Sequence, residues 1–420
     1  MDINELLKGS HCSCGRHHRC DTQHVMIEKD AISSLRELTG DYHSILIVAD
    51  ENTFSAAGDK TLTAIAGRHS RSIIFPGNPI LIPNEDAIAQ ITQELNGIDL
   101  IIGIGSGVIQ DLCKYVSFYH SIPYFIVATA PSMDGYASTG AAMILDGMKV
   151  TVSAKVPTAI IADTEVLKHA PMDMIQAGYG DIVGKYSALN DWKLSSVVNG
   201  EYFCQYIYDL TFEMLQKTLS LADGLLKRDE ESVKVLMEAL TVVGIAMSFA
   251  GSSRPASGSE HHLSHYFEIT GIVHGEEYFP HGIDVAYSTV LTAGLREQLL
   301  NQPWPKAQYR PTKEAYLAEL SRIYGPVANG CAALQEKVGL YKKDMLSVYN
   351  EKSHEILSVL SEMPSAKEIE TMLNAVGLDM KEFYTLYSEK KIADGIAYAK
   401  ELKDRYTVLW MYYDIFGHKF

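Results

Sequence analysis

Positive charge is scarce in this sequence. Its 420 residues include 36 Lys and Arg against 52 Asp and Glu, which gives a formal net charge of −16. A surface with this excess of negative charge repels nucleic-acid phosphates and anionic lipid headgroups. The composition therefore speaks against binding to nucleic acid or to a membrane surface. Any small anionic substrate would need a local pocket of basic residues.

Long apolar runs and cysteines are also in short supply. No run approaches the roughly 18–20 apolar residues of a membrane-spanning helix. The first 20 residues contain acidic side chains and lack the apolar core of a secretory signal. The six cysteines are too few and too scattered to form a disulfide framework in a chain this long. We therefore expect a cytoplasmic protein without membrane insertion.

The composition is that of a globular protein, with 47% hydrophobic and 21% charged residues. Short β-rich apolar runs recur in the first half, bounded by Gly, Pro, Asn or Asp and mostly separated by helix-compatible sequence. These runs are Ser44–Asp50, Arg71–Pro76, Asp99–Gly105, Tyr124–Ala130 and Thr158–Asp163. Runs that are apolar on both faces and alternate with helices predict a parallel sheet covered on both sides. A further segment, Met143–Val152, predicts a hairpin around Asp146-Gly147.

Strand signals stop beyond about Pro171. From there, apolar residues recur every three or four positions, as in amphipathic helices. The clearest such stretches are Glu201–Leu226, Glu230–Phe249, Asp344–Leu360 and Ala366–Val376. We therefore predict a Cys/His-rich tail (residues 1–25), an α/β dinucleotide-binding domain with a parallel sheet (26–170) and an all-helical domain (171–420), with the active-site cleft between the last two.

A glycine-rich turn follows one predicted strand and opens a helix. Gly103, Gly105 and Gly107 allow positive φ angles and remove side chains that would keep a pyrophosphate from the helix N-terminus. Because the spacing is not the standard GxGxxG, a turn without a ligand remains the alternative. Asp50 ends an earlier strand, where it could accept hydrogen bonds from an adenosine ribose or cap the next helix.

The loop Thr129–Ser138 ends the predicted strand that begins at Tyr124. Ligands of open parallel sheets bind beyond the carboxyl ends of strands, where this loop must lie. It offers hydroxyl and carboxylate groups at Thr129, Ser132, Asp134 and Ser138. The alternative is an ordinary turn rich in Asp, Gly and Ser.

Five histidines stand close together in the predicted helical domain: His261, His262, His265, His274 and His281. His261 and His265 share one helix face, while His262 points away from it. A divalent ion needs three or more converging donors, and neutral imidazoles are common ones. For His262 and His274 we favour surface or structural roles. Asp181 is a candidate carboxylate ligand, although its own surroundings favour a helix N-cap.

Five motifs occur in an order that resembles a known family. They are GSG followed by Asp111 and Lys114, TAPSMDGYAS, GYGD, SRPASGSEHHLSH and HGIDVAYST. Together they resemble the glycerol-1-phosphate dehydrogenases, especially the bacterial AraM-like branch, within the superfamily of iron-dependent alcohol dehydrogenases and dehydroquinate synthases. The resemblance covers roughly Asp50 to His281. One departure is GIGSG where GGGS is usual, and another is that His274 could compete for the last metal position.

The resemblance implies roles residue by residue. Asp181, His261 and His281 match the metal ligands, and His265, Asp134 and again Asp181 match substrate contacts with catalytic roles. The implied dinucleotide contacts are Asp50, Gly105, Ser106, Gly107, Val108, Ile109, Gln110, Asp111, Thr129, Ala130, Pro131, Ser132 and Ser138. For a substrate phosphate, Arg254 is the leading candidate from its place just before His261, and Lys155 and Lys185 are weaker ones.

The implied reaction is the reversible reduction of dihydroxyacetone phosphate to sn-glycerol 1-phosphate by NADH or NADPH. The metal is one divalent ion, nickel first and zinc next, and the expected assembly is a homodimer. A carboxylate at Asp50 would repel a 2′-phosphate and so favours NAD. The alternatives are a glycerol dehydrogenase for the unphosphorylated triol, a dehydroquinate synthase, which would need more basic residues, and a non-catalytic nucleotide- or metal-binding protein.

The first 20 residues contain a separate cluster of metal-binding side chains, in the sequence HCSCGRHHRC. Cys12, Cys14, His17 and Cys20 are potential ligands of a second metal, but the CxC spacing is tighter than in zinc fingers. We therefore favour a flexible, metal-scavenging tail over a structural site.

Overall fold

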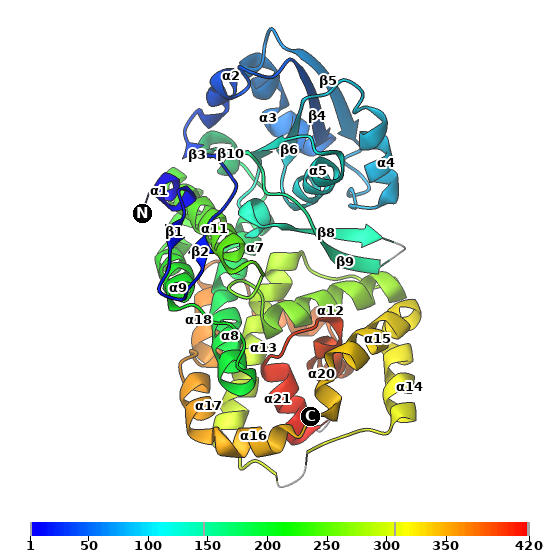
Figure 1. The fold of residues 1–420 in the computed structure, drawn as a ribbon. Helices are drawn as coiled ribbons and strands as arrows, with labels where there is room; N and C mark the ends of the chain where they lie inside the picture. Colours follow the sequence, from blue (N-terminus) through cyan, green and yellow to red (C-terminus); the bar gives the residue numbers. More distant parts are fainter. Residues whose placement is uncertain (1, 146–147, 306–307, 418–420) are drawn as a thin grey trace. The chain divides into compact units, whose positions relative to one another are not determined.

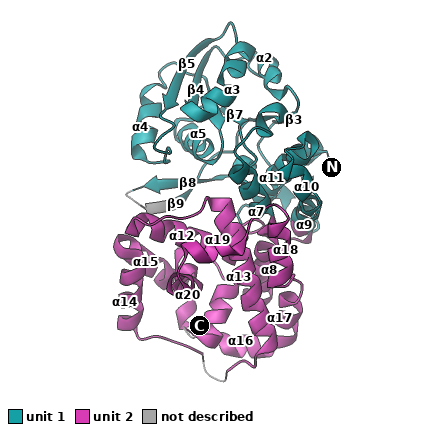
Figure 2. Cartoon of the chain, turned by 180° about the vertical axis from the view of Figure 1, so that it is seen from behind, with its two compact units in different colours: residues 1–182, 209–253 teal, residues 183–208, 254–420 magenta. Residues whose placement is uncertain are grey.

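The computed structural model describes residues 2–145, 148–305 and 308–417. The chain forms two compact units, shown in different colours in Figure 2. Unit 1 contains Met1–Ile182 and Asp209–Ser253, and unit 2 contains Val183–Tyr208 and Arg254–Phe420. The chain thus passes three times from one unit to the other, whereas the sequence pattern placed a single boundary near residue 170.

Unit 1 is built on a six-stranded parallel sheet with the strand order β3-β10-β7-β6-β4-β5 (Figure 1). Its strands are β3 (His24–Glu28), β4 (Ser44–Asp50), β5 (His69–Phe75), β6 (Leu100–Gly105), β7 (Tyr124–Ala128) and β10 (Ala159–Asp163). Five of the six are the predicted apolar runs. The edge strand β3 was missed because it is short and polar at both ends.

The central strands carry the core of unit 1. Every residue of β6, β7 and β10 is buried, because helices cover both faces of a parallel sheet. The predicted hairpin is confirmed as the antiparallel pair β8 (Gly140–Leu145) and β9 (Met148–Ser153). Its expected turn at Asp146-Gly147 lies outside the described residues.

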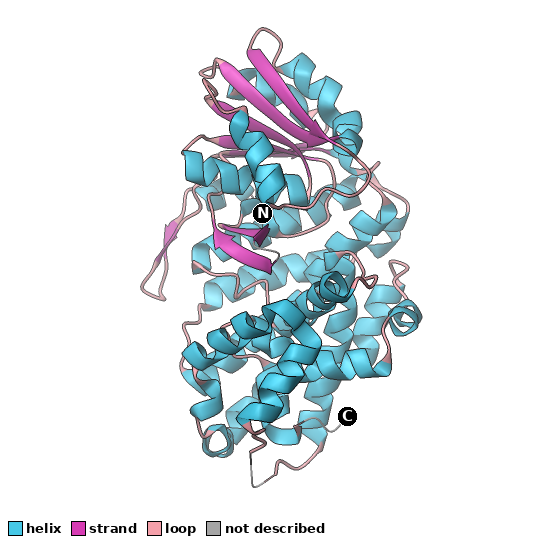
Figure 3. Cartoon of the chain, turned by 90° about the vertical axis from the view of Figure 1, so that its right-hand side faces the viewer, coloured by secondary structure: helices cyan, strands magenta, loops and turns pink. Residues whose placement is uncertain are grey.

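The helices of unit 1 flank the sheet and extend beyond it (Figures 1 and 3). They are α1 (Ile3–Leu7), α2 (Leu35–Leu38), α3 (Glu51–Ala64), α4 (Glu85–Gln93), α5 (Gly107–His120), α6 (Thr164–Leu167), α7 (Met172–Val183), most of α9 (Gln205–Leu219), α10 (Ala222–Leu226) and α11 (Glu230–Ala250), with the 3-10 turns η1 (Ala31–Ser34) and η2 (Gly135–Ala137).

One helix of unit 1, α11, is long and apolar enough to cross a membrane, with a mean hydropathy of 1.8 over its most apolar window. That window is 78% buried inside the protein. Burial of this kind is typical of a core helix in a soluble protein. The sequence shows no uninterrupted apolar run here, because Lys234 and Glu238 interrupt it.

Unit 2 is helical throughout its described residues. It contains α8 (Lys185–Asn199), α12 (Ser259–His274), α13 (His281–Asn301), α14 (Lys313–Tyr324), α15 (Ala328–Val338), α16 (Met345–Glu351), α17 (Ser353–Leu360), α18 (Ala366–Asn374), α19 (Met380–Leu386), α20 (Glu389–Tyr398) and α21 (Val408–Phe416), with the 3-10 turns η3 (Gly325–Val327), η4 (Leu340–Lys342) and η5 (Ala399–Leu402). The fold class is therefore as predicted, an α/β part followed by a largely helical part.

The N-terminal residues are not the flexible tail that composition suggested. A two-stranded antiparallel hairpin, β1 (Ser10–His11) and β2 (His17–His18), packs against α11 within unit 1. His18 is fully buried there, and its ring stacks on Phe249 with 5.5 Å between ring centroids.

Candidate active site

Three predicted ligand segments meet at the carboxyl edge of the sheet in unit 1. Strand β6 pairs with β4 on one side and with β7 on the other. Because β4 also pairs with β5, the strand order reverses between β4 and β6, and ligands of such sheets bind at this point. Asp50 ends β4, Ser106 follows β6 and Thr129 follows β7, so the fold brings these segments together.

Asp50 is the N-cap of α3. Its carboxylate accepts a hydrogen bond from the Thr53 amide at 2.9 Å, and the Thr53 hydroxyl completes a reciprocal capping box. The side chain remains partly exposed at the sheet edge. The cap is thus observed, and the ribose contact stays a prediction.

The glycines of the GIGSG turn are needed because there is no room for a side chain at Gly103 and Gly105. Positive φ angles, which the sequence argument invoked, do not occur at Gly103, Gly105 or Gly107. A Cβ atom on Gly103 would lie 2.8 Å from Cys113 Sγ, and one on Gly105 would lie 2.6 Å from the side chain of Ile109. The glycines therefore let α5 pack closely on β6, with its N-terminus at the sheet edge.

Not all the predicted dinucleotide contacts present their side chains to a ligand. Ile109 packs under the glycines, and Gln110 is fully buried, where its amide donates to Tyr124 Oη and to the Tyr136 carbonyl. At these two positions only the backbone is suited to contact a cofactor. Ser106, the N-cap of α5, makes no side-chain cap bond.

The loop Thr129–Ser138 is held by a buried lysine from α5. Lys114 Nζ donates to the Gly135 carbonyl at 2.6 Å, to the Gly140 carbonyl at 3.0 Å and to Ser138 Oγ at 3.1 Å. Burial lowers the pKa of Lys114, while Asp111 and Asp134 favour its charged form. Lys114 thus fixes the loop, and Ser138 takes part in this anchoring.

Two glycines let the same loop approach the neighbouring helices of unit 1. A Cβ atom on Gly178 of α7 would lie 1.8 Å from the Pro131 carbonyl oxygen. One on Gly244 of α11 would lie 2.8 Å from the Asp134 carbonyl oxygen. The GYGD motif therefore contributes a glycine, Gly178, that makes room for the loop, as well as the candidate ligand Asp181.

Asp181 lies inside α7 and is not the N-cap that its local sequence favoured. Its side chain is fully buried and accepts a hydrogen bond from the Asp134 amide at 3.0 Å. Asp134 is itself buried, with 8% of its surface exposed. The two predicted carboxylates of unit 1 are therefore neighbours.

Three of the five histidines converge within unit 2. The ring centroids lie 5.1 Å apart for His261 and His281, 5.3 Å for His265 and His281, and 6.3 Å for His261 and His265. His261 and His265 lie one turn apart on α12, and His281 is the first residue of α13. The other two do not join them. His262 is fully buried with neither ring nitrogen bonded to a described residue, and His274 bonds the Ile323 carbonyl.

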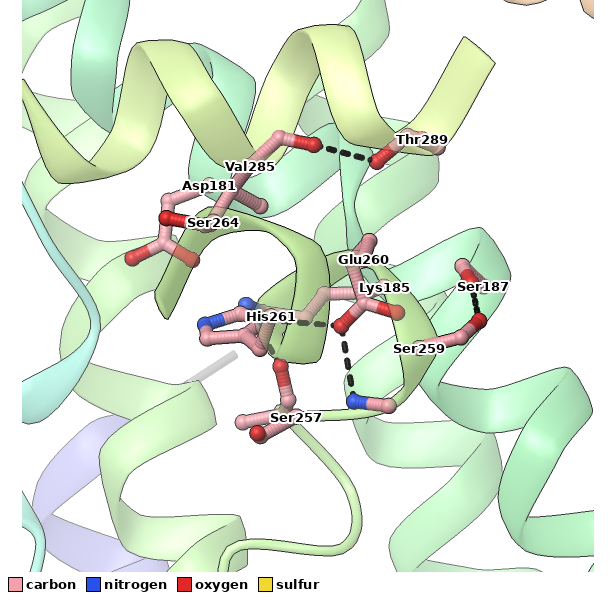
Figure 4. A network of polar contacts seen from close by, with 12 residues as sticks. Asp181, Lys185, Ser187, Ser257, Ser259, Glu260, His261, Ser264, Val285 and Thr289 are labelled. Atoms are coloured by element: carbon pink, nitrogen blue, oxygen red, sulfur yellow. Dashed lines mark hydrogen bonds and ion pairs between the residues drawn. The ribbon is translucent and has the colours of Figure 1, made fainter. Parts of the chain in front are cut away.

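The imidazole of His261 is oriented by a buried carboxylate (Figure 4). Glu260 Oε1 lies 2.7 Å from His261 Nδ1 and accepts the Gly258 amide at 2.8 Å. Burial alone would raise the pKa of Glu260, but the His261 ring, the Gly258 amide and Lys185 together lower it. A carboxylate on Nδ1 leaves Nε2 as the lone-pair donor, the usual arrangement for a metal-binding histidine.

The other two histidines are also held in place. Ser264 Oγ lies 3.2 Å from His281 Nδ1. His265 Nδ1 lies 3.9 Å from Glu268 Oε2, and one donor atom from each of His265, Glu268 and His281 lies within 4.8 Å of the others. Sequence reasoning missed Glu268, although its spacing three residues after His265 on one helix face was a usable signal.

The leading phosphate candidate is engaged elsewhere. Arg254 is buried and donates to both carboxylate oxygens of Glu201, to Ser195 Oγ and to the Tyr406 carbonyl. Lys185, also buried, donates to the Ala256 carbonyl. Lys155 lines a separate cavity of about 550 Å³ in unit 1.

Two cations that sequence reasoning missed act on the first turn of α12. Arg405 donates to the Ser257 carbonyl at 3.1 Å, next to the N-terminus of α12, and burial lowers its pKa to about 10. Besides burial, the charges of Arg405, Lys403 and Arg254 lower the pKa of His262, so all three act on α12. Arg405 and Lys403 follow η5, which packs against this helix. Nothing in their local sequence indicated this, because the contact joins segments about 150 residues apart.

The donor set fits a divalent transition metal. Imidazoles with one carboxylate suit zinc, nickel and iron alike. In unit 2 the histidines converge and His261 is oriented through its other nitrogen, as a ligand must be. In unit 1 the buried Asp181 supplies the candidate carboxylate.

Comparisons with known proteins identify a similar family model and a similar fold. A family model described as iron-containing alcohol dehydrogenase matches residues 26–171. The structure of an iron-containing alcohol dehydrogenase from Thermococcus thioreducens superposes with a TM-score of 0.62 at 15% identity, covering 94% of this chain and 98% of the other. This similarity shows that the two proteins share a fold.

Two curated relatives narrow the class further. Glycerol-1-phosphate dehydrogenase from Halalkalibacterium halodurans is 30% identical over 97% of this chain and 98% of its own. The enzyme of that name from Geobacillus thermodenitrificans is 31% identical over 87% of this chain and 86% of its own. The chain belongs to the glycerol-1-phosphate dehydrogenase family.

Proposed function

We propose that this protein is a metal-dependent glycerol-1-phosphate dehydrogenase that interconverts dihydroxyacetone phosphate and sn-glycerol 1-phosphate with NAD(H) or NADP(H). Near-full-length similarity to the relatives of that name supports the reaction. The observation that carries the chemistry is the convergence of His261, His265 and His281, with His261 oriented by the Glu260 carboxylate.

Asp181, His261 and His281 are the residues proposed to hold the metal. When bound, the ion supplies positive charge that stabilises the oxygen at C2 as it becomes an alkoxide. His265 and Asp134 orient the substrate hydroxyls, and His265 moves the proton to or from the C2 oxygen. The segments after β4, β6 and β7 bind the dinucleotide, with the backbone at the start of α5 facing its pyrophosphate.

The substrate phosphate needs cations that can turn toward it. Arg254 is tied to Glu201 and serves the packing of unit 2. We therefore assign the phosphate to Arg405 and Lys403, beside the positively polarised N-terminus of α12. A local positive patch is required because the net charge of the whole chain is −16.

The proposal also covers the identity of the metal, the preferred cofactor and the assembly of the enzyme. The resemblance to the bacterial branch of the family favours nickel as the metal, with zinc as the second choice, and Asp50 favours NAD over NADP. The enzyme works as a homodimer in the cytoplasm.

The deciding experiment compares two substrates. NADH oxidation is measured with dihydroxyacetone phosphate and with dihydroxyacetone, after chelation and after adding back nickel or zinc. We expect activity that depends on the metal and strongly favours the phosphorylated substrate. Equal or better turnover of dihydroxyacetone would identify a glycerol dehydrogenase, and no turnover of either would favour a non-catalytic binding protein.

Two arginine variants test the phosphate assignment. Arg405→Gln should raise KM for dihydroxyacetone phosphate at least tenfold and leave KM for dihydroxyacetone unchanged, since only one of these carries a phosphate. Arg254→Lys should lower thermal stability, because a lysine cannot bridge Glu201 with the same fork of donors. If Arg254→Lys instead gave the selective KM effect, the sequence-based assignment would be restored.

Ligand variants test the metal set. His261→Ala and Asp181→Asn should each remove bound metal together with turnover, because two donors hold an ion weakly. Glu268→Gln should keep the metal. Loss of metal in Glu268→Gln with retention in Asp181→Asn would instead assign the carboxylate ligand to unit 2.

A further inference from the structure

The hairpin at the N-terminus gathers two thiols and an imidazole at one point. Cys12 and Cys14 lie in its turn, which is closed by hydrogen bonds from the Gly15 amide to the Cys12 carbonyl and from the Cys12 amide to the Arg16 carbonyl, both 3.0 Å. Gly15 adopts a φ of +84°, which lets the turn close so tightly. Both sulfur atoms and one ring nitrogen of His18 lie within 4.8 Å of one another.

His18 is oriented as a metal ligand is. Its Nδ1 lies 3.2 Å from the Phe249 carbonyl oxygen, which can only accept, so Nδ1 carries the proton. The Nε2 atom therefore presents its lone pair, and it lies 3.5 Å from Cys14 Sγ. Donation of the second ring N–H to a carbonyl is the usual way in which proteins fix the tautomer of a ligating histidine. Here α11 supplies that carbonyl.

The positions of the sulfur atoms are also compatible with a zinc site. The Cys14 amide donates to Cys12 Sγ at 3.5 Å, which fixes this sulfur atom within the turn. With Zn–S bonds of about 2.3 Å and Zn–N bonds of about 2.0–2.1 Å, donor atoms of a tetrahedral zinc site lie about 3.5–3.8 Å apart. The separation of Cys14 Sγ from His18 Nε2 falls at this spacing.

We propose that Cys12, Cys14 and His18 bind a structural Zn²⁺ ion that closes the N-terminal hairpin, which His18 Nδ1 joins to α11 through the Phe249 carbonyl. Two soft thiolates and an imidazole form a zinc donor set, which differs in kind from the carboxylate and imidazoles of the proposed catalytic metal. The short CxC spacing is compatible with the site because a tight turn, and not a helix, carries both cysteines. A water molecule or a further cysteine completes the coordination.

The test uses Co²⁺ as a spectroscopic substitute for zinc in the full-length protein. After removal of metals, Co²⁺ is added and the sulfur-to-cobalt charge-transfer absorption is recorded, alongside the zinc content per chain of untreated protein. We expect one thiolate-bound ion per chain, and its loss in Cys14→Ser and His18→Asn. The matched controls are Cys20→Ser and His17→Asn, which change residues of the same types just outside the cluster and should keep the band.

Two further variants guard against misfolding and against confusion with the catalytic metal. Cys14→His keeps a donor at this position, so it should still bind the ion but with weaker charge-transfer absorption, since one thiolate is lost. His261→Ala should keep the band fully, although it loses the catalytic metal. Removal of zinc should lower the melting temperature of the wild type and have no such effect in Cys14→Ser.

The intensity of the cobalt band decides whether the zinc site exists. A band intensity that corresponds to two or three thiolates supports the proposal, and three would be followed by Cys113→Ala, Cys204→Ala and Cys331→Ala to find the third. Absence of a thiolate band in the wild type, or an unchanged band in both Cys14→Ser and His18→Asn, would overturn the site. Neither result depends on whether the chain turns over dihydroxyacetone phosphate.

Discussion

At the scale of single residues, Glu260 prepares His261 for its role. Its carboxylate is fully buried, yet its pKa is lowered, because the His261 ring, the Gly258 amide and Lys185 outweigh the effect of burial. The group therefore stays ionised and holds the proton of the imidazole on Nδ1. A charged acceptor also makes the other nitrogen a stronger donor to a metal ion.

Glu260→Gln should therefore weaken metal binding about 10–100-fold, the usual effect of removing the partner of a ligating histidine. The amide can still accept the hydrogen bond but carries no charge. Metal affinity is measured by competition with a chelator, with His274→Gln as the control, since His274 bonds a backbone carbonyl away from the cluster. Equal affinities in Glu260→Gln and wild type would show that the carboxylate only fills space.

Asp284 is a buried carboxyl group whose protonation should affect stability. Burial raises its pKa well above the usual value, although Tyr387 Oη donates to both of its oxygens. Because the folded-state pKa exceeds the unfolded one, its contribution to stability is full at low pH and is lost as the pH rises through the folded pKa.

Asp284→Asn should consequently gain stability relative to the wild type as the pH is raised from 5 to 8. The variant has no titrating group at this position, whereas the wild-type Asp284 is ionised in the unfolded protein and must take up a proton, or be ionised in a buried place, on folding. Melting temperatures of both proteins are compared at each pH, so that other titrating groups cancel. Parallel curves would mean that Asp284 is ionised in both the folded and the unfolded protein over this range, so that its pKa is not raised by burial.

At the scale of elements, the loop Thr129–Ser138 is defined by the helices around it. Lys114 of α5 holds it by three hydrogen bonds, and the missing side chains of Gly178 and Gly244 let it lie against α7 and α11. The same contact places the Asp134 amide on Asp181. The predicted cofactor loop and the candidate metal ligand Asp181 are thus joined by a backbone hydrogen bond.

Gly178→Ala should disturb both the loop Thr129–Ser138 and the position of Asp181. A methyl group 1.8 Å from a carbonyl oxygen forces the loop or the helix to move, at a cost of about 1–3 kcal/mol in the free energy of unfolding. We expect KM for NADH to rise several-fold, in steady-state assays. The control is Gly294→Ala in α13, where the new Cβ meets nothing within 4 Å and should stabilise the helix by up to about 1 kcal/mol.

Lys114→Met tests the anchoring separately. Methionine fills similar space but leaves the carbonyls of Gly135 and Gly140 and the Ser138 hydroxyl without their donor. KM for NADH should rise while bound metal is retained, because no proposed ligand is touched. Metal loss comparable to that in His261→Ala would show that the loop also controls the metal ligands.

At the scale of the whole molecule, the net charge of −16 opposes the approach of a phosphorylated substrate. Salt screens this long-range repulsion, since the Debye length falls from about 30 Å at 0.01 M to about 10 Å at 0.1 M ionic strength. Contacts in a local phosphate pocket are screened less. The kcat/KM for dihydroxyacetone phosphate should therefore rise by up to a few-fold over this range, with uncharged dihydroxyacetone as the control. A steep fall would show that the basic pocket dominates even at long range.

Much of the fold was predictable because its signals are local. Strands buried on both faces must be apolar throughout, so β4, β6, β7 and β10 appeared directly as apolar runs. The edge strand β5 is largely exposed, and only the apolar residues at its end indicated it. The edge strand β3 lacked that signal, and the predicted helix over Glu201–Leu226 is divided into α9 and α10. The spacing of apolar residues did not indicate which of the later helices belong to unit 1 and which to unit 2.

The candidate site was predictable in its residue types but not in its partners. The histidine spacing and the family resemblance indicated His261, His265 and His281, which do converge. Local sequence favoured Asp181 as a cap, whereas it lies inside α7, and it could not show that Arg254 is tied to Glu201. Arg405 left no sign in its local sequence. Each of these depends on which side chain lies opposite, often more than 50 residues away.

The sequence by itself determined the class of fold, the order of its elements and the kinds of donors available for metal, because burial and hydrogen bonding impose short-range patterns on any chain. The tertiary structure alone decided which donors meet, which cations are already paired and why the turn glycines are needed. Those properties depend on the packing of distant segments, and a pattern of neighbouring residues carries no information about the side chains that will lie against it.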